Sequence, residues 1–171
     1  IGCLLLEHLL SALSEQGRLP KNGVVIKSIV STRLADAIAA RYGVQLIDVL
    51  TGFRFISEQI DAFQKSGEKQ FLFGFEESYG FLAGGFSRDK DAILSAVLAA
   101  EMCVCFAERG MTLYDGLQAL YRTYGFYHER VASYTLEGKA GIERIAATMD
   151  ALRMAVDEGL DIVRVAVHCT E

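Results

Sequence analysis

Hydrophobic side chains recur at two different spacings along the first part of the chain. Leu6, Leu10 and Leu13 lie three or four positions apart, which predicts an amphipathic helix that ends near Gly17. Short β-branched or aromatic runs follow, and such runs are typical of buried strands. They predict strands at 24–30, 44–50 and 71–76, separated by one helix that stops at Gly43 and a second that carries Ile56, Ile60 and Phe63.

The alternation of strands and helices predicts the fold class. Strands and helices that alternate at short intervals indicate parallel strands joined by right-handed crossovers. We therefore expect an α/β fold, a three-layer α/β/α domain with a mostly parallel, four-stranded mixed sheet. Weak alternation of apolar and polar residues places the fourth strand near 130–136, in antiparallel orientation. The carboxyl ends of the parallel strands should meet at one edge, where ligands bind in open α/β sheets.

A long apolar run follows the third strand. It predicts a helix over about 91–109 that is buried on more than one side, since apolar residues surround nearly its whole circumference. Glu101 interrupts the run, which falls short of the roughly 20 apolar residues of a membrane span. A helix capped by Thr112 and a last helix from Gly141 complete the pattern. We expect one domain over residues 1–155 and a C-terminal tail, 156–171, that leads toward a missing domain.

Composition and charge narrow the class of partner. The 171 residues are 51% hydrophobic and carry a net charge of −5. This charge argues against nucleic acid or an anionic membrane as partner, because both require a basic surface. The four cysteines lack the paired spacing of a metal site, and Cys103 and Cys105 are predicted to be buried free thiols. A reducing, cytoplasmic setting and the absence of a metal site in this chain follow as expectations.

The candidate chemistry lies in the stretch 71–91, which reads FLFGFEESYGFLAGGFSRDKD. Its apolar beginning runs directly into Glu76, Glu77 and Ser78 at the expected carboxyl edge. Carboxylates accept hydroxyl protons and a serine both donates and accepts, so the group suits a polyhydroxylated ligand such as a sugar. Glu76 and Ser78 face the same way in an extended segment, and Glu77 faces the other. The alternative is an acidic surface turn. Because an exposed loop at a sheet edge contributes little to the core, we expect that substitution of Glu76 or Ser78 would not much alter folding.

Two segments carry a resemblance to a known family. GFEESYG followed by RDKDA resembles the sugar-recognition loop of the α-D-phosphohexomutases, the phosphoglucomutase/phosphomannomutase superfamily. VVIKSIVSTRLADAIAARYGVQLIDVLTGFRFI, residues 24–56, is similar to the start of that family's third domain. The sequences of these motifs are most similar to those of the phosphoglucomutase/phosphopentomutase branch, and the resemblance covers most of residues 1 to about 155.

The resemblance implies which residues bind the sugar. In the family pattern G-E-x-S the glutamate and serine hold neighbouring sugar hydroxyls, which assigns these roles to Glu76 and Ser78. Because Phe75 lies between Gly74 and Glu76, Glu77 remains the alternative for the glutamate.

Two further groups are implied as substrate-binding residues. The family pattern R-x-K-D brings Arg88 and Lys90 to the sugar phosphate or ring oxygens; the alternative is a solvated basic pair at a helix N-terminus. The pattern T-x-G-[FW]-K/R places Thr51, Gly52 and Arg54 over the ligand, and the alternative is an ordinary strand-to-helix turn.

The resemblance also implies an enzyme whose chemistry lies elsewhere. Phosphohexomutases move a phosphoryl group between the 1- and 6-positions of a sugar, or the 1- and 5-positions of a pentose. They use a phosphoserine, Mg²⁺ held by a DGDxDR loop, a sugar bisphosphate activator and a phosphate-binding fourth domain. None of these motifs is in this chain, so no catalytic or metal-binding residue is assigned here. We expect the sugar-recognition domain of such an enzyme, inactive alone, with a phosphosugar and the remaining domains as partners.

Two alternatives remain open from the sequence. One is a stand-alone sugar-phosphate-binding or regulatory α/β domain without catalysis. The other is a complete small enzyme that uses Glu76 and Glu77 as acid and base. The second is weaker, because adjacent strand residues point to opposite faces while paired catalytic carboxyls must face one substrate.

Overall fold

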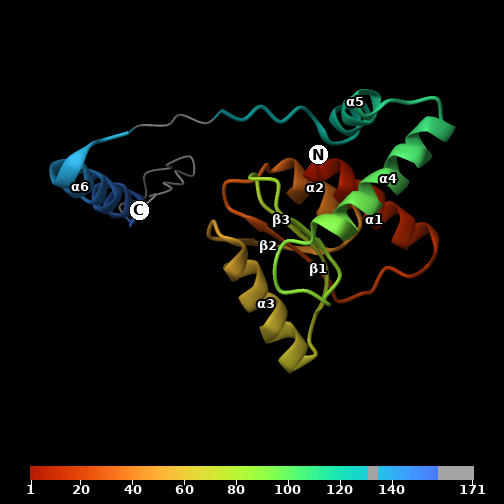
Figure 1. Cartoon of the computed structure of the whole chain (residues 1–171), viewed down its shortest axis with the longest axis horizontal. Coiled ribbons are helices and arrows are strands. Elements are labelled where there is room, and N and C mark those ends of the chain that lie inside the picture. Colours follow the sequence, from red (N-terminus) through yellow and green to blue (C-terminus); the bar gives the residue numbers. More distant parts are fainter. Residues whose placement is uncertain (131–134, 158–171) are drawn as a thin grey trace. The chain divides into compact units, whose positions relative to one another are not determined.

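The computed structural model describes residues 1–130 and 135–157, with side chains described as far as Met154 (Figure 1). The chain divides into two compact units, one of residues 1–128 and one that begins at Glu129. The second unit contains helix α6, Gly138–Asp157. The first unit contains every other helix and strand that the structure describes. The predicted boundary near residue 155 stays a prediction.

A four-stranded mixed sheet forms the centre of the first unit (Figure 1). Its strands are β1 (Gly23–Ser28), β2 (Gln45–Val49), β3 (Gln70–Phe75) and β4 (Phe81–Ala83), in the order β2-β1-β3-β4. β1 pairs in parallel with both β2 and β3, and β4 runs antiparallel to β3. The fold class and the three predicted parallel strands are confirmed.

The fourth strand comes from a different segment than the sequence pattern indicated. β4 follows β3 after a tight turn in which the Glu76 amide donates to the Gly80 carbonyl over 2.9 Å. Tyr79 makes this reversal possible by adopting a left-handed conformation with φ of 61°. In the described part of the chain β4 is the antiparallel strand of this sheet, whereas the sequence pattern placed that strand near 130–136. Residues 131–134 lie outside the described part, and their described neighbours are not in strand conformation.

Helices cover both faces of the sheet, which confirms the three layers. Among the described helices of the first unit, α3 (Phe53–Ser66) alone packs on one face, where Ile56 and Ile60 meet Val24 and Ile26. The other face is covered by α1, α2, α4 and α5, around a core that includes Leu6, Ile38 and Phe73. Their bounds are Gly2–Glu15, Leu34–Arg41, Ala92–Glu108 and Leu113–Tyr124.

α4 is less buried than its composition indicated. Only Ser95, Leu98 and Met102 are buried along this helix, which contacts β4, α1 and α5 through one side. The expectation of burial on more than one side was wrong within this chain, and Cys103, although free, is exposed rather than buried. No helix among the described residues is long and apolar enough to cross a membrane.

Candidate functional site at the carboxyl edge of the sheet

Three loops meet at the carboxyl edge of the parallel strands. They follow β1, β2 and β3, and they comprise residues 29–33, 50–52 and 76–80. The parallel pairing in register, with Ser28 opposite Val49 and Lys27 opposite Phe75, brings the three strand ends to the same level. The sheet therefore places the predicted site residues of the second and third loops at one edge.

Glu76 connects these loops through its carboxylate. Its Oε1 accepts the backbone N–H of Gly52 over 2.9 Å, and its Oε2 lies 3.0 Å from Nζ of Lys90. The Ser78 hydroxyl lies 3.5 Å from the same Oε2. Glu76, Ser78, Gly52 and Lys90, four of the residues predicted to bind substrate, therefore lie together.

The burial of Glu76 differs from the exposed turn that the sequence indicated. Glu76 is only 5% exposed, whereas Ser78 and Tyr79 on the same turn are exposed. A buried carboxylate needs partners, and Lys90 and the Gly52 amide supply them. The expectation that Glu76 is exposed is therefore wrong, and we now expect its substitution to affect folding.

Gly80 allows the Lys90 side chain to reach Glu76. A Cβ atom at Gly80 would lie 2.7 Å from Cε of Lys90, closer than real Cβ contacts, and 3.0 Å from Oε2 of Glu76, tighter than most of them. The side chain of Lys90 is 45% exposed, so its ammonium group has protons left for a ligand. The pair presents an acceptor and a donor side by side, which is the complement of neighbouring hydroxyls or of a hydroxyl beside a phosphate.

The two arginines predicted to bind substrate contact other residues than Glu76 and Lys90. Arg88 Nε lies 2.5 Å from Oδ1 of Asp61, and the guanidinium also donates to Gln64 and to the Gly85 carbonyl, so Arg88 is directed at α3. Arg54 is exposed in the first turn of α3, with its guanidinium carbon 4.6 Å from the Phe55 ring centroid. Thr51 is half-buried beside Gly52.

Glu77 has a separate set of partners at the same edge. Its Oε2 accepts the hydroxyl of Ser28 over 2.6 Å, and Ser28 Oγ lies 2.8 Å from Ser31 Oγ. An ionised carboxylate only accepts, so the Ser28 proton goes to Glu77 and Ser31 must donate to Ser28. The adjacent carboxylates thus bind different groups. The assignment of the sugar-binding role to Glu76 rather than to Glu77 stays a prediction.

Lys27 is a residue of this edge that sequence reasoning missed. It is completely buried at the end of β1, with Nζ 2.7 Å from Oδ1 of Asp48, 3.6 Å from Oδ2 of Asp36 and 3.3 Å from the Ser31 carbonyl. These contacts hold the loop after β1 against β2 and α2. The signal was in the sequence: a lysine within VVIKSIV and an aspartate within LIDV are charges in buried strands, and such charges require partners.

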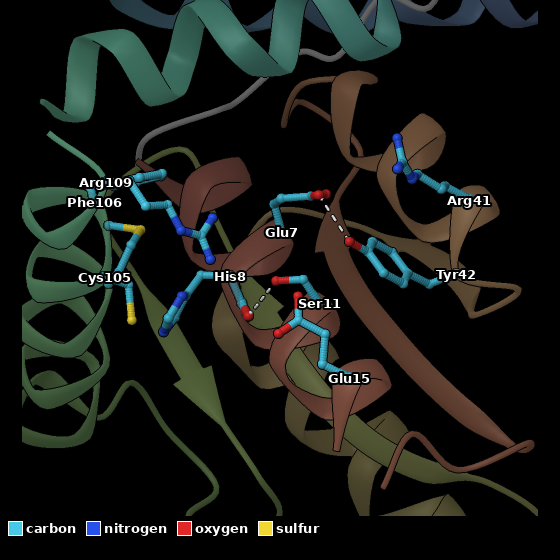
Figure 2. A pocket seen from close by; sticks show the side chains of 10 residues that line it. Glu7, His8, Ser11, Glu15, Arg41, Tyr42, Cys105, Phe106 and Arg109 are labelled. Atoms are coloured by element: carbon cyan, nitrogen blue, oxygen red, sulfur yellow. Dashed lines mark hydrogen bonds between the residues drawn. The ribbon is translucent and has the colours of Figure 1, made fainter. Parts of the chain in front are cut away.

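One cavity lies away from this edge. It has a volume of about 260 Å³ and lies among α1, the end of α2 and α4, and none of its lining residues belongs to the edge loops (Figure 2). There Glu7 accepts the hydroxyls of Tyr42, over 2.9 Å, and of Tyr124, over 2.7 Å. Burial, followed by the contact with Glu7, raises the pKa of Tyr42 to about 12 and raises that of Tyr124 further.

The residues that the structure describes provide no ligand set for a metal ion. Among them no group of three or more His, Cys, Asp or Glu side chains is placed to hold one. The Mg²⁺ that the family resemblance implies therefore does not fit this part of the chain, and no chemical step is derived through it here.

The fold and its edge define an α/β/α domain with a carboxylate–ammonium pair where its parallel strands end. The family described as "Phosphoglucomutase/phosphomannomutase, alpha/beta/alpha domain III" matches residues 2–124, and the chain belongs to this family. The resemblance seen in the sequence is confirmed.

Curated relatives agree with this assignment. The chain is 39% identical over 153 residues to a phosphoglucomutase of Staphylococcus saprophyticus, covering 90% of this chain and 27% of that protein. It is 38% identical over 168 residues to a phosphoglucomutase of Staphylococcus haemolyticus, covering 96% and 30%. The chain thus spans less than a third of the length of these relatives.

Solved structures support the fold. A candidate phosphomannomutase of Thermus thermophilus superposes with a TM-score of 0.54 at 23% identity, covering 78% of this chain and 30% of that one. The open form of parafusin, a phosphoglucomutase from Paramecium, gives a TM-score of 0.51 at 20% identity, covering 73% and 21%. At this level of identity the likeness concerns the fold alone.

Proposed function

We propose that this chain is the sugar-recognition domain of a phosphoglucomutase-type enzyme. The enzyme would move a phosphoryl group between the 1- and 6-positions of a sugar phosphate, or the 1- and 5-positions of a pentose phosphate. The observation that carries the proposal is the Glu76–Lys90 pair, with its 3.0 Å contact, at the meeting point of the loops. Family membership and the names of the relatives support the reaction class.

The parts of the reaction would be divided within the polypeptide. Phosphoryl transfer depends on positioning and on neutralisation of charge by metal and cationic groups. The phosphoserine, the Mg²⁺ that neutralises phosphate charge, and the site for a sugar bisphosphate activator would come from the remaining domains. This chain would hold the sugar. Cys103 and Cys105 form no disulfide, which fits a cytoplasmic enzyme.

The geometry suggests how a sugar would be held. One hydroxyl would donate to the Glu76 carboxylate while a neighbouring oxygen accepts a hydrogen bond from Lys90. The exposed Ser78 hydroxyl would serve as donor or acceptor to the next oxygen. The Gly52 amide fixes the carboxylate before the ligand arrives. Such preorganisation lowers the entropic cost of binding.

The test is Glu76→Gln in the complete enzyme. The amide keeps the shape but loses the charge-assisted hydrogen bonds, each worth about 1.5 to 3 kcal/mol, so kcat/KM should fall roughly tenfold to more than a hundredfold. Ser78→Ala removes a neutral hydrogen bond of about 0.5 to 1.5 kcal/mol and should cost roughly two- to tenfold. Steady-state kinetics with glucose, mannose and ribose 1-phosphates measures both effects and identifies the preferred sugar.

Glu77→Gln is the matched control. It is the same chemical change one residue away, and its amide oxygen still accepts the Ser28 hydroxyl. Thermal unfolding of each variant separates lost binding from lost folding, because Glu76 is buried. If Glu77→Gln damages kcat/KM while Glu76→Gln does not, the assignment is shifted by one residue. If neither variant changes kcat/KM, the sugar-binding role of this turn is refuted.

A further inference from the structure

The turn that carries the proposed sugar-binding groups is tied to the centre of the sheet by a side-chain contact. Residues 77–79 are exposed, so packing contributes little to holding them in place. The Glu77 carboxylate accepts the hydroxyl of Ser28 over 2.6 Å. Ser28 is the last residue of β1 and is only 1% exposed. The contact therefore joins an exposed turn after β3 to a buried residue of the neighbouring strand.

The Ser28 end of this contact is held on several sides. β1 lies between β2 and β3 in the sheet. The backbone N–H of Ser31 donates to the Ser28 carbonyl over 3.0 Å, and the two hydroxyl oxygens lie 2.8 Å apart. The buried Lys27 donates to the Ser31 carbonyl over 3.3 Å. Because Ser31 donates to the Ser28 hydroxyl, the single proton of Ser28 is left for Glu77.

The contact acts on the neighbours of Glu77 in the turn. Glu76 ties the turn to the loop after β2 through the Gly52 amide, whereas Glu77 ties it to the end of β1. Glu77 is covalently bonded to Glu76 and to Ser78, so a fixed Glu77 carboxylate restricts the backbone on both sides of it. The two anchors together set the direction in which Ser78 is presented.

We propose that Ser28, acting through Glu77, is a positioning residue that holds the turn 76–80 in its ligand-binding conformation. This rests on the proposed function of that turn. Ser28 acts without touching the sugar. An exposed turn opens locally without unfolding the sheet beneath it. When only a fraction of the molecules has the competent conformation, the apparent dissociation constant rises by the reciprocal of that fraction.

The first experiment is Ser28→Ala in the complete enzyme, with glucose 1-phosphate as the varied substrate. We expect KM to rise about fivefold and kcat to change less than about twofold, because the bound sugar orders the turn again. A merely structural role would reduce the amount of active enzyme, which lowers kcat and leaves KM unchanged. The matched control is Ser31→Ala, the same change at a buried neighbour that leaves the Ser28 hydroxyl in place. Its KM should equal that of the wild type.

The second experiment removes the contact from its exposed end, which keeps the test valid if Ser28→Ala does not fold. Glu77→Ala deletes the acceptor and should raise KM as Ser28→Ala does. Glu77→Gln keeps an oxygen that accepts the Ser28 hydroxyl and should recover most of the wild-type KM. The double variant Ser28→Ala/Glu77→Ala should have a KM no higher than either single variant, because both changes remove the same contact.

Three outcomes would overturn the proposal. An unchanged KM in both Ser28→Ala and Glu77→Ala would show that the contact does not position the turn. An equal rise of KM in Ser31→Ala would assign the effect to packing of the loop after β1. Effects that multiply in the double variant would show that Ser28 and Glu77 act independently.

Hydrogen exchange tests the positioning without activity. The Glu76 amide donates across the turn to the Gly80 carbonyl over 2.9 Å. In the complete enzyme without substrate, Ser28→Ala should speed exchange of this amide at least about threefold, since the turn opens more often. If exchange rises but Glu76→Gln leaves kcat/KM unchanged, Ser28 holds the turn and the sugar-recognition role fails. If Glu76→Gln lowers kcat/KM while Ser28→Ala alters neither exchange nor KM, the positioning role is refuted and the proposed function stands.

Discussion

Lys27 lies buried beneath the carboxyl edge of the parallel strands. Its ammonium group is completely buried and pairs with Asp48 while it contacts Asp36 and the Ser31 carbonyl. A buried ion pair contributes little net stability over an apolar replacement, but removal of one partner leaves an uncompensated buried charge.

Lys27→Met should therefore destabilise the protein by about 3 kcal/mol, the lower end of the usual range, because Asp36 and Asp48 are partly accessible to water. Urea unfolding measures the change. The double variant Lys27→Met/Asp48→Leu removes both charges of the closest pair and should recover part of the loss. If the single variant unfolds at the same urea concentration as the wild type, the pair has no structural role.

Gly80→Ala tests the close approach of Lys90 to the turn. The added methyl group would displace the Lys90 stem, which is flexible, and would separate it from Glu76. We expect a fall in kcat/KM of roughly tenfold in the complete enzyme, the loss of one charge-assisted contact, with a small change in Tm. The matched control is Gly85→Ala, whose methyl group would meet only Gln64, at 3.6 Å. Equal kinetics for both variants would contradict the role of Gly80.

At this scale the sequence identified part of the edge. The loop motifs and the strand order predicted that four residues lie together, and the structure shows three of them in contact with the first: Glu76, Ser78, Gly52 and Lys90. Arg88 belongs to the same RDKD motif as Lys90, yet its guanidinium is directed at Asp61 on α3. The rotamer of a long side chain depends on neighbours far along the chain, which a local pattern does not contain.

At the scale of elements, three helices converge on one carboxylate. Glu7 of α1 accepts hydroxyls from Tyr42, at the end of α2, and from Tyr124, at the end of α5 (Figure 2 shows the first). Tyr124→Phe should lower the free energy of unfolding by about 1.5 to 3 kcal/mol, the usual contribution of a hydrogen bond to a charged group. Urea unfolding beside Tyr114→Phe, an exposed tyrosine on the same helix, provides the comparison. An equal effect of the two variants would refute a contribution from the Glu7 contact.

The same contact predicts a loss of stability in alkali. In the folded state the pKa of Tyr42 is raised to about 12 and that of Tyr124 is raised further, whereas an unfolded tyrosine has the ordinary pKa of 10.0. Between these values the folded state binds more protons, so the free energy of unfolding falls as pH rises, and the full contribution is present below about pH 10. Urea midpoints between about pH 8 and pH 12 measure the slope. Tyr124→Phe should flatten it, and an unchanged slope would contradict this origin.

Element prediction succeeded where a segment is long and periodic. The helices and the three parallel strands were found because their apolar positions repeat. β4 was missed because its three residues are too few to show a repeat of apolar positions. Its position also depends on the chain reversal at Tyr79. The exposure of α4 was missed because composition shows that a helix is apolar but not what lies beside it.

At the scale of the whole molecule, we expect no catalysis from this chain alone. Purified and supplied with glucose 1-phosphate, Mg²⁺ and glucose 1,6-bisphosphate, it should form no glucose 6-phosphate above the blank, since the phosphoryl-transfer groups would reside in other domains. A coupled dehydrogenase assay measures the product, with the complete enzyme as the positive control. Product formed by the chain itself would refute its role as a recognition domain.

The order β2-β1-β3-β4 has a consequence for how the protein emerges from the ribosome. β1 is made first but lies inside the sheet, and both of its neighbours are encoded later. Its second neighbour ends at Phe75, 47 residues after β1 ends at Ser28. At about 5–20 residues per second, the open backbone edge of a largely apolar strand therefore waits roughly 2 to 10 seconds for its cover during synthesis. Such a transiently unpaired strand edge is prone to aggregation until its neighbours are made.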